Sequence, residues 1–396
     1  MVVIVNALRT PIGKYGGSLS QILPEEMAAT VMNNSLSLSG FRPDIVDEVI
    51  LGQTKQSAHT PNIARVASLL AGFPEEVTAY TVHRQCGSGM QSVYNGFMAI
   101  LSGQAEVVLA GGVENMSQAP YYSIGQRFGM NPGNMILYDS NTESQMRSQP
   151  ADKYGSFQMG ETAEFLAEKY GITREEQDEF AFYSQLKAKK AIETGKFNDE
   201  IVPIETKEGK KNIRLFGADE FPRATEMEQL AKLSAVFKKG GTVTAGNSSG
   251  RNDGASMLLL MSEKRARELE LTPLASIRAI SVAGIQPMEM GLGPVPASKK
   301  ALQACGLQLK DMNLIELNEA FAAQSLAVLK EWGISGEGVN VNGGAIALGH
   351  PLGCSGARIM TTLVHEMQKQ DVKYGLATLC IAGGQGIAAV VEKWNS

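Results

Sequence analysis

Three short stretches rich in glycine carry side chains that could take part in covalent chemistry. They are CGSGM at 86–90, NGGAIALGHPLGCSG at 342–356 and CIAGGQG at 380–386. Because glycine lacks a Cβ atom, the backbone in each stretch can bend tightly and present a reactive side chain. A thiol at Cys86, an imidazole at His350 and a second thiol at Cys380 are the groups that acyl transfer combined with proton abstraction requires.

Each of these three residues also has an ordinary structural interpretation when it is taken alone. Cys86 is expected at a helix start, where unpaired N–H groups would favour the thiolate, but a buried and unreactive cysteine fits that position equally well. His350 lies between glycines and before Pro351, which suits either an imidazole held in a pocket or a structural turn. Cys380 ends an apolar stretch, and the N–H groups of the turn after it could face an oxyanion.

Length and composition exclude several classes of protein. The 396 residues predict two or three domains, and a net charge of −5 argues against a nucleic-acid-binding protein. No stretch is apolar enough for a membrane helix, and the N-terminal MVVIVNALRTPIG predicts a buried strand, not a signal peptide. Four scattered cysteines without a Cys-x-x-Cys pair argue against a disulfide scaffold and a zinc site, so we expect a cytoplasmic protein without a metal. The glycine spacings match neither a dinucleotide fingerprint nor a P-loop.

The order of predicted elements repeats along the chain. Segment 24–51 corresponds to segment 296–318. The helix near Cys86 and the strand 106–112 correspond to the helix near Cys354 and the strand 376–384. Weak repeats of this kind can arise by chance, but the matching helix starts favour a true duplication. The strands are short and almost continuously apolar, which is typical of strands buried between helix layers. We therefore expect an α/β protein with two duplicated βαβαβ-type halves.

A region of different character separates the two halves. It is polar, punctuated by glycine and proline, and predicts two charged helices near 160–170 and 173–194. Thr173 and Glu176 form a capping box at the start of the second helix. Because large surface loops commonly carry ligand contacts, this region is expected to bind the ligand. The predicted domains are a first half at 1–113 with 246–270, an inserted loop domain at 114–245, and a second half at 271–396.

These stretches together resemble the thiolase family along the whole chain. They follow one another in the family's order: NALRTPIGKYGG, HRQCGSGMQS, GGVENMS, TVTAGNSSGRNDGAS, LNEAFAAQS, NVNGGAIALGHPLGCSG and CIAGGQG. Within the family, the likeness is strongest to the acetyl-CoA acetyltransferases, or acetoacetyl-CoA thiolases. The resemblance implies a layered α/β/α/β/α fold, and acetyl-CoA, acetoacetyl-CoA and CoA as substrates and products. It also implies no separate cofactor and a homodimer or homotetramer.

The resemblance also assigns roles to the reactive residues. Cys86 would take the acyl group as a thioester, and His350 would deprotonate Cys86. Cys380 would act as acid and base on the α-carbon of the second substrate and on the leaving CoA thiolate. Asn318 would hold a water that forms one oxyanion hole with His350, and the backbone N–H groups of Cys86 and Ala382 would form the other. This set suits a Claisen condensation, which needs a base and a stabilised enolate oxygen.

Further residues are predicted to contact the substrate. Ser249 resembles the pantetheine contact of the family, and the other predicted contacts are Ala245, Gln158, Met159 and Phe321. Residues 206–240 contain eight basic and five acidic side chains, a local charge of +3 in an acidic protein. Most of these lysines are expected to be solvated. Arg223 is the predicted contact of the CoA phosphates, because its planar guanidinium can donate paired hydrogen bonds.

Two departures from the family pattern keep other functions open. Gln158 stands where acetoacetyl-CoA thiolases commonly have histidine, which weakens the prediction of a short-chain substrate. Ala382 stands where glycine is usual, and its N–H can serve only if the site does not require a positive φ. A degradative 3-ketoacyl-CoA thiolase of broader chain length would use the same residues. An inactive protein that binds acyl-CoA is disfavoured because Cys86, His350 and Cys380 are all present.

Overall fold

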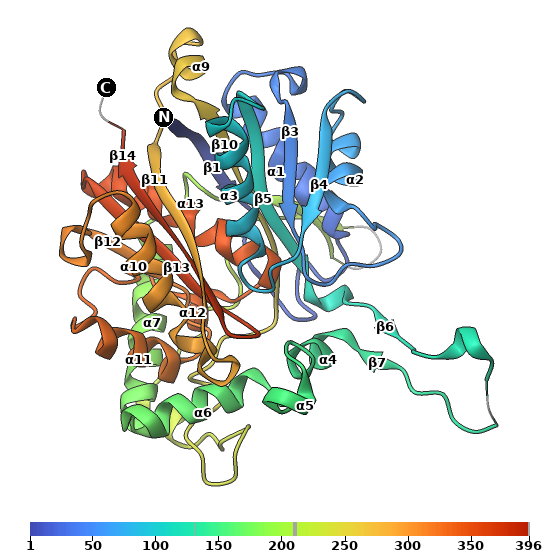
Figure 1. Cartoon of the computed structure of the whole chain (residues 1–396), viewed down its shortest axis with the longest axis vertical. Helices are drawn as coiled ribbons and strands as arrows, with labels where there is room; N and C mark the ends of the chain where they lie inside the picture. The colour runs from blue at the N-terminus through green and yellow to red at the C-terminus, as the bar shows by residue number, and fades with distance from the viewer. Residues whose placement is uncertain (131, 209–211, 395–396) are drawn as a thin grey trace.

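The computed structural model describes residues 1–130, 132–208 and 212–394 and contains one large mixed β-sheet with helices on its faces (Figure 1). Its strands lie in the order β12 (Leu314–Leu317), β13 (Tyr374–Ile381), β14 (Gln385–Lys393), β11 (Ala275–Gly284), β1 (Val2–Arg9), β10 (Asn252–Ser262), β5 (Val107–Asn115), β3 (Glu48–Gly52) and β4 (Thr78–Val82). The short β2 (Gly13–Lys14) pairs with β10. The N-terminal residues form the buried strand β1, as the sequence predicted.

The sheet consists of two halves with the same strand order. In the first half β1, β10, β5 and β3 are neighbours, and in the second half β11, β14, β13 and β12 follow in the corresponding order. The predicted duplication is therefore confirmed. The sequence did not indicate how the halves join. They meet edge to edge, through antiparallel pairing of Val2–Ile4 in β1 with Ala275–Ile277 in β11.

Helices complete a five-layer arrangement. The outer layer of the first half contains α1 (Pro24–Leu38) and α2 (Ile63–Leu70), and the central layer contains α3 (Ser88–Leu101) and α13 (Leu352–Gln370). The outer layer of the second half contains α10 (Pro294–Ala304) and α11 (Ala322–Trp332). Two short helices, α9 (Glu263–Glu268) and α12 (Ala345–Leu348), lie in the connections. The structure thus has the α/β/α/β/α layers expected of the fold.

Alternation along the strands divides the interior into three cores. In β10, Leu259 faces the outer core of the first half, whereas Leu258 and Leu260 face the central core. In β13, Leu376 faces the outer core of the second half and Ala377 faces the central one. Side chains of a strand point to opposite faces in turn, so one apolar strand serves two cores. This explains why the strands are almost continuously apolar.

Close packing of the central helices brings the two halves together. A Cβ atom on Gly89 of α3 would lie 2.7 Å from the carbonyl oxygen of Gly353 and 2.9 Å from the backbone nitrogen of Ala357. A Cβ atom on Gly356 of α13 would lie 2.4 Å from the backbone nitrogen of Met90. Only glycine allows backbones to approach so closely. The loops that precede both helices are therefore neighbours.

The region between the halves contains two longer helices and several short elements. They are β6 (Tyr121–Tyr122), β7 (Tyr138–Asp139), α4 (Ser140–Met146), α5 (Ala151–Tyr154), α6 (Met159–Tyr170), α7 (Arg174–Glu193), β8 (Ile204–Glu208), β9 (Asn212–Phe216) and α8 (Met227–Ala231). The two charged helices predicted here are confirmed as α6 and α7. The capping box of α7 is present, because Thr173 Oγ1 accepts from Glu176 N at 3.1 Å and Glu176 accepts from Thr173 N at 2.6 Å. The chain between β6 and β7 extends away from the body as an arm (Figure 1).

The described part of the chain contains neither a membrane-spanning helix nor a metal-binding cluster. None of its helices is long and apolar enough to cross a bilayer. Within the same residues, no three His, Cys, Asp or Glu side chains are grouped so that they could hold a metal ion.

Candidate active site

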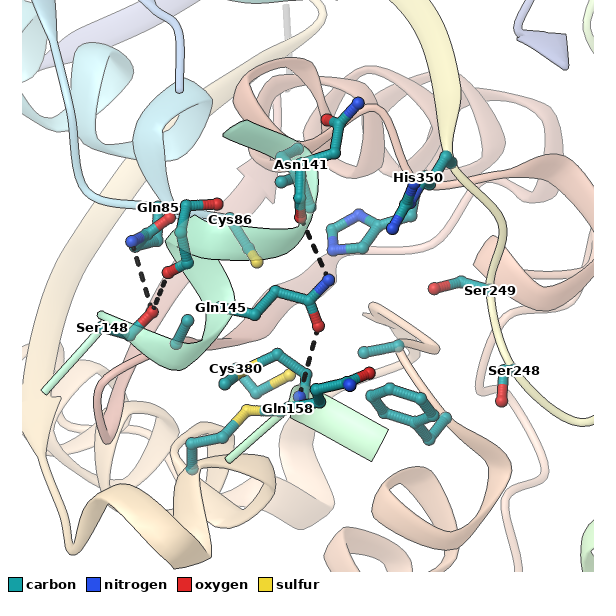
Figure 2. Close-up of a pocket in the computed structure, with 18 of the residues that line it drawn as sticks. Gln85, Cys86, Asn141, Gln145, Ser148, Gln158, Ser248, Ser249, His350 and Cys380 are labelled. Atoms are coloured by element: carbon teal, nitrogen blue, oxygen red, sulfur yellow. Dashed lines mark hydrogen bonds between the residues drawn. The ribbon is translucent and has the colours of Figure 1, made fainter. Parts of the chain in front are cut away.

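A cavity of about 210 Å³ lies where loops from both halves meet the helices of the intervening region (Figure 2). Eight of the residues predicted from the sequence line it: Cys86, Gln158, Met159, Ser249, Phe321, His350, Cys380 and Ala382. Cys86 precedes α3, His350 precedes α13, and Cys380 lies near the end of β13. The duplicated scaffold thus delivers the three reactive side chains to one cavity.

A tight turn fixes Cys86 in front of α3. The preceding residue, Gln85, has a φ of 45°, which is uncommon for a residue with a side chain. Ser88 Oγ accepts a hydrogen bond from Arg84 N at 2.8 Å and donates to the carbonyl oxygen of Gln85 at 2.6 Å. These bonds hold the strained backbone in place, and strain of this kind is concentrated at functional sites.

The thiol of Cys86 is neutral in the resting protein. It keeps some solvent contact through the cavity, but surrounding protein atoms raise its pKa to about 11, because burial disfavours the thiolate. The backbone N–H groups of Ala382 and Cys86 and the charge of Lys55 lower this pKa and offset part of the shift. The N–H groups therefore act in the direction expected for a helix start, but burial outweighs them.

A serine of α13 determines which nitrogen of His350 carries the proton. Ser355 Oγ lies 2.8 Å from the carbonyl oxygen of Pro351, to which it can only donate its single proton. His350 Nδ1 lies 2.6 Å from the same Oγ and must therefore be the donor of that second bond. The other nitrogen, Nε2, carries a lone pair and lies 3.5 Å from Asn318 Nδ2. The imidazole is thus held with its basic nitrogen available.

Burial keeps the other two reactive groups uncharged as well. It lowers the pKa of His350 to about 3, and the nearby positive charge of Arg358 acts in the same direction. Burial also raises the pKa of the Cys380 thiol, and the charge of Cys86 adds to that shift. All three side chains are neutral at rest, so a charge on one of them is favourable only when an opposite charge forms beside it.

Two further predicted residues lie close to the reactive side chains: Asn318 next to His350, and Ala382 in the lining of the cavity. Asn318 is fully buried next to His350 and does not line the cavity, and its Oδ1 accepts no hydrogen bond from the described residues. Such a buried oxygen is suited to accept one from a water or a substrate. Ala382 is not among the described non-glycine residues with positive φ, whereas Gly383 and Gly384 have φ values of 84° and 82°. The N–H of residue 382 therefore does not require glycine.

Several lining residues were not predicted from the sequence. Helix α4 and the turn after it contribute a polar wall with Asn141, Ser144, Gln145 and Ser148. Gln145 bridges this wall to α6: its Nε2 donates to the carbonyl oxygen of Asn141 at 3.1 Å, and its Oε1 accepts from Met159 N at 3.3 Å (Figure 2). No motif or periodic pattern in this polar segment indicates which side chains face inward.

An apolar wall completes the cavity. Met116, Phe237, Met290 and Leu352 line it together with the predicted Met159 and Phe321. The ring of Phe237 packs edge-on against Phe321, with a centroid distance of 6.0 Å. It also lies against the α6 backbone at Gly160, where a Cβ atom would approach the ring to 2.2 Å. Phe237 is therefore held in place by two contacts, one with the predicted lining residue Phe321 and one with the backbone of α6 at Gly160.

Two predicted substrate contacts lie outside the cavity lining. Arg223 and Ala245 are both exposed, and Arg223 Nη2 lies 3.4 Å from the carbonyl oxygen of Ala245. The guanidinium of Arg223 also stacks on the ring of Phe221, at 5.4 Å from its centroid. Ala245 is three residues before Ser248, which does line the cavity. Of the basic residues counted near Arg223, Lys210 and Lys211 lie outside the described residues.

Comparisons with known proteins agree with this architecture. Profiles of the "Thiolase, N-terminal domain" and the "Thiolase, C-terminal domain" match residues 2–264 and 271–393. An acetyl-CoA acetyltransferase of Pseudomonas aeruginosa is 51% identical over 393 residues, which cover 99% of both chains. The crystal structure of the Bacillus anthracis acetyl-CoA acetyltransferase has a TM-score of 0.95 at 48% identity and covers 99% of this chain and 98% of its own. Human mitochondrial 3-ketoacyl-CoA thiolase in complex with CoA has a TM-score of 0.94 at 45% identity, with coverages of 99% and 98%. The chain therefore belongs to the thiolase family.

Proposed function

We propose that this protein is an acetyl-CoA acetyltransferase, which condenses two molecules of acetyl-CoA to acetoacetyl-CoA and CoA and also catalyses the reverse cleavage. Full-length relatives with this name are about half identical in sequence, such as the 51% identical protein of Pseudomonas aeruginosa. One observation carries the proposal furthest. Two thiols and an imidazole converge in one cavity, with the backbone of Ala382 beside them; His350 Nδ1 is bonded to Ser355 Oγ, and its Nε2 lies 3.5 Å from Asn318 Nδ2.

In the first half-reaction, Cys86 becomes acylated. His350 Nε2 takes the thiol proton, and the thiolate attacks the carbonyl carbon of acetyl-CoA. The backbone N–H groups of Cys86 and Ala382, which favour negative charge at this sulfur, are assigned to the oxyanion of the tetrahedral intermediate. When the C–S bond to CoA breaks, Cys380 gives its proton to the leaving thiolate. Free CoA departs, and the enzyme holds acetyl-Cys86, an imidazolium at His350 and a thiolate at Cys380.

The second half-reaction neutralises the two charges that the first half-reaction left on Cys380 and His350. The Cys380 thiolate removes a proton from the methyl group of a second acetyl-CoA. The oxygen of the resulting enolate is stabilised by His350 Nε2–H and a water on Asn318 Oδ1. The enolate carbon attacks the carbonyl carbon of acetyl-Cys86, acetoacetyl-CoA forms as the Cys86 sulfur leaves, and His350 returns the proton to that sulfur. Every proton is thus back in its starting place.

The cavity favours a short acyl group. Its volume is about 210 Å³, and the apolar side is occupied by Phe237, Met290 and Phe321. Broader chain length is the second candidate function, because a human mitochondrial 3-ketoacyl-CoA thiolase has nearly the same fold at 45% identity. The two candidates use the same reactive side chains, so only the room beside them separates the two activities.

A series of substrates of increasing length tests the proposal. Cleavage of acetoacetyl-CoA by free CoA is followed through loss of the substrate's enolate absorbance and compared with 3-ketohexanoyl-CoA and longer homologues. We expect kcat/KM to be highest for acetoacetyl-CoA and to fall steeply with each added pair of carbons. Equal or rising kcat/KM along the series would assign the broader activity, and no cleavage of any member would leave an acyl-CoA-binding protein.

Arg223 is proposed to contact the phosphates of CoA. It is exposed, lies next to Ala245 and forms no ion pair with any residue that the structure describes. A planar guanidinium can donate two parallel hydrogen bonds to a phosphate. Arg223→Ala is expected to raise KM for acetyl-CoA severalfold while kcat stays near the wild-type value. A loss of kcat at unchanged KM would instead assign Arg223 to support of the reactive geometry.

We further propose that the protein forms a homodimer or homotetramer. The arm between β6 and β7 exposes large apolar side chains, most of all Phe128 with 96% of its surface exposed, and also Ile124, Met135, Ile136 and Leu137. Exposed apolar surface of this extent is typical of an association site. Sedimentation of the full chain is expected to show an oligomer that becomes smaller when Phe128 and Ile136 are both replaced by aspartate. A monomeric wild type would contradict the proposal.

The compartment is proposed to be the cytoplasm. Four cysteines are free, and two of them, Cys86 and Cys380, line the cavity in the thiol form that the reaction requires. Thiols persist in a reducing compartment. Activity recovered with the cytosolic fraction of the source cells is the expected result, and activity confined to an oxidising compartment would contradict it.

A further inference from the structure

A lysine is buried close to the reactive cysteine without an ion-pair partner. Lys55 follows β3 and is only 5% exposed. Its Nζ donates to the carbonyl oxygen of Ser140 at 3.0 Å and to Ser144 Oγ at 2.6 Å, both in α4. Among the described residues it forms no ion pair, and its third N–H has no acceptor. Lys55 is therefore a buried cation with neutral partners only.

The backbone around Lys55 is firmly attached to the site. Lys55 N and Thr54 N donate to the buried carboxylate of Glu114, at 2.9 and 3.0 Å. The same carboxylate accepts from Gly353 N at 2.8 Å, in the first turn of α13 after His350. Glu114 thus links the Lys55 loop to the helix that carries the base. These bonds fix the backbone at Lys55, and the bonds to Ser140 and Ser144 fix its Nζ against α4.

A buried cation that forms no direct ion pair destabilises the folded protein. Burial lowers the pKa of Lys55, and the charges that face it reduce this shift: Glu114 of β5, then Cys86, then Asp139 at the start of α4. The positive charge of Arg251, which lines the cavity, lowers the pKa of Lys55 further. The proposed reaction adds a negative charge at Cys86 to those of Glu114 and Asp139.

We propose that Lys55 is a positioning residue for the reaction, whose buried ammonium stabilises the negative charge that passes through Cys86 and whose hydrogen bonds hold α4 against the cavity. The inference rests on the proposed role of Cys86 as nucleophile. Ser144, which accepts a hydrogen bond from Lys55, lines the same cavity as Cys86. The charge of the ammonium and its hydrogen bonds to α4 therefore act on the site from the same side. A charge that is already in place needs no reorganisation when the thiolate forms.

Alkylation of Cys86 by iodoacetamide tests this inference without any acyl-CoA. The rate is measured across pH for the wild type, Lys55→Met and Lys55→Arg, and mass spectrometry confirms that Cys86 is the alkylated site. We expect Lys55→Met to alkylate roughly tenfold more slowly at neutral pH, with the rise in rate displaced to higher pH, because removal of a nearby positive charge raises a thiol pKa by about one unit. Lys55→Arg keeps the charge and is expected to restore most of the rate. Lys189→Met, which removes a lysine that is 64% exposed on α7, is the matched control and should behave as the wild type.

Thermal unfolding separates this role from a merely structural one. Lys55→Met removes a buried charge that forms no ion pair, so its Tm is expected to equal or exceed that of the wild type although the alkylation rate falls. Lys55→Gln keeps a hydrogen-bond donor toward Ser140 and Ser144, so it provides a folded neutral variant should Lys55→Met fail to fold. Wild-type alkylation rates in both neutral variants would overturn the proposal. Equal losses of rate and Tm in the methionine, glutamine and arginine variants would also overturn it. Because no acyl-CoA is used, these results stand apart from the outcome of the substrate series.

Discussion

The two halves of the molecule place a cysteine near the start of equivalent helices, but the two cysteines are in different environments. Cys86 lies in the turn before α3 and lines the cavity, where the backbone N–H groups of Ala382 and Cys86 offset part of the rise in its pKa. Cys354 lies within the first turn of α13, is completely buried, and has its pKa raised to about 12 by burial. A helix start alone therefore does not place a thiol in the cavity. Access to the cavity distinguishes the two.

The supports of the reactive side chains are similar in both halves. In the first half, the hydroxyl of Ser88 fixes the turn that carries Cys86. In the second half, the hydroxyl of Ser355 fixes the ring of His350. Each serine lies in the first turn of its helix. The duplicated scaffold therefore supplies the same kind of support for the proposed nucleophile in one half and the proposed base in the other.

Replacing the two cysteines in turn is expected to show the largest difference between the halves. Cys86→Ala should lower kcat by roughly 10⁴-fold or more, because it removes the nucleophile. Cys354→Ala should keep kcat within about threefold of the wild type and cost about 1 kcal/mol of unfolding free energy, as is usual for a small buried change. Steady-state assays and urea unfolding measure both. Comparable losses of activity in the two variants would mean that the halves are not specialised as described.

The division of labour within the second half is tested by Cys380→Ser. This variant should still form acetyl-Cys86 but should condense about 10³-fold more slowly, since a hydroxyl is a far weaker acid and base at neutral pH than a thiol. Exchange of the methyl protons of acetyl-CoA with deuterated water, followed by NMR, should fall in parallel. Undiminished proton exchange in Cys380→Ser would show that another group removes the α-proton.

Ser355→Ala is expected to weaken the base without disturbing the nucleophile. Without the serine, Nδ1 loses its acceptor, and the tautomer with the proton on Nε2 becomes accessible. We expect the acylation rate to fall roughly 10–100-fold, with KM for acetyl-CoA unchanged. In a protein with four histidines, ¹⁵N NMR of labelled rings can show which nitrogen of His350 is protonated. A wild-type ring protonated on Nε2 would contradict the tautomer inferred from the hydrogen bonds.

The buried base also predicts a modest dependence of stability on pH. His350 has its pKa lowered from 6.5 to about 3 in the folded protein, so between these values the unfolded chain binds more protons. Stability is therefore expected to fall as the pH drops from 6.5 toward 3, by about 1–2 kcal/mol between pH 6.5 and 5 from this residue alone. The difference between wild type and His350→Gln in urea unfolding at the two pH values isolates the contribution. An equal pH dependence in both proteins would mean that His350 titrates normally.

The sequence was sufficient to predict the fold and most of the side chains that meet in the cavity. The duplicated element order, the capping box at Thr173 and the glycines that follow Cys86 and precede His350 are all visible in the chain. Glycine was informative for a physical reason that the structure makes explicit. Gly89 and Gly356 allow two helix backbones to touch, which a sequence shows only as an unusual density of glycine.

The remaining features depend on distances between segments that are far apart in the chain. The polar wall of α4 and the burial of Lys55 give no periodic signal, because each depends on packing against a loop some 85 residues away, as in the hydrogen bond from Lys55 to Ser140. The pKa of Cys86 could not be predicted because burial, which depends on the packing of distant segments, outweighs the backbone N–H groups that lower this pKa. Arg223 was placed from its charge and neighbours alone, and the structure puts it outside the cavity lining.

The central claim is that Cys86 alone becomes acylated, whereas Cys380 donates and removes protons. The most direct measurement is to mix the protein with isotopically labelled acetyl-CoA, quench within milliseconds, digest the protein, and locate the label by mass spectrometry. We predict the acetyl group on the peptide that contains Cys86, in the wild type and in Cys380→Ser, and none on Cys354 or Cys380. Label on Cys380, or label that persists in Cys86→Ala, would contradict the account.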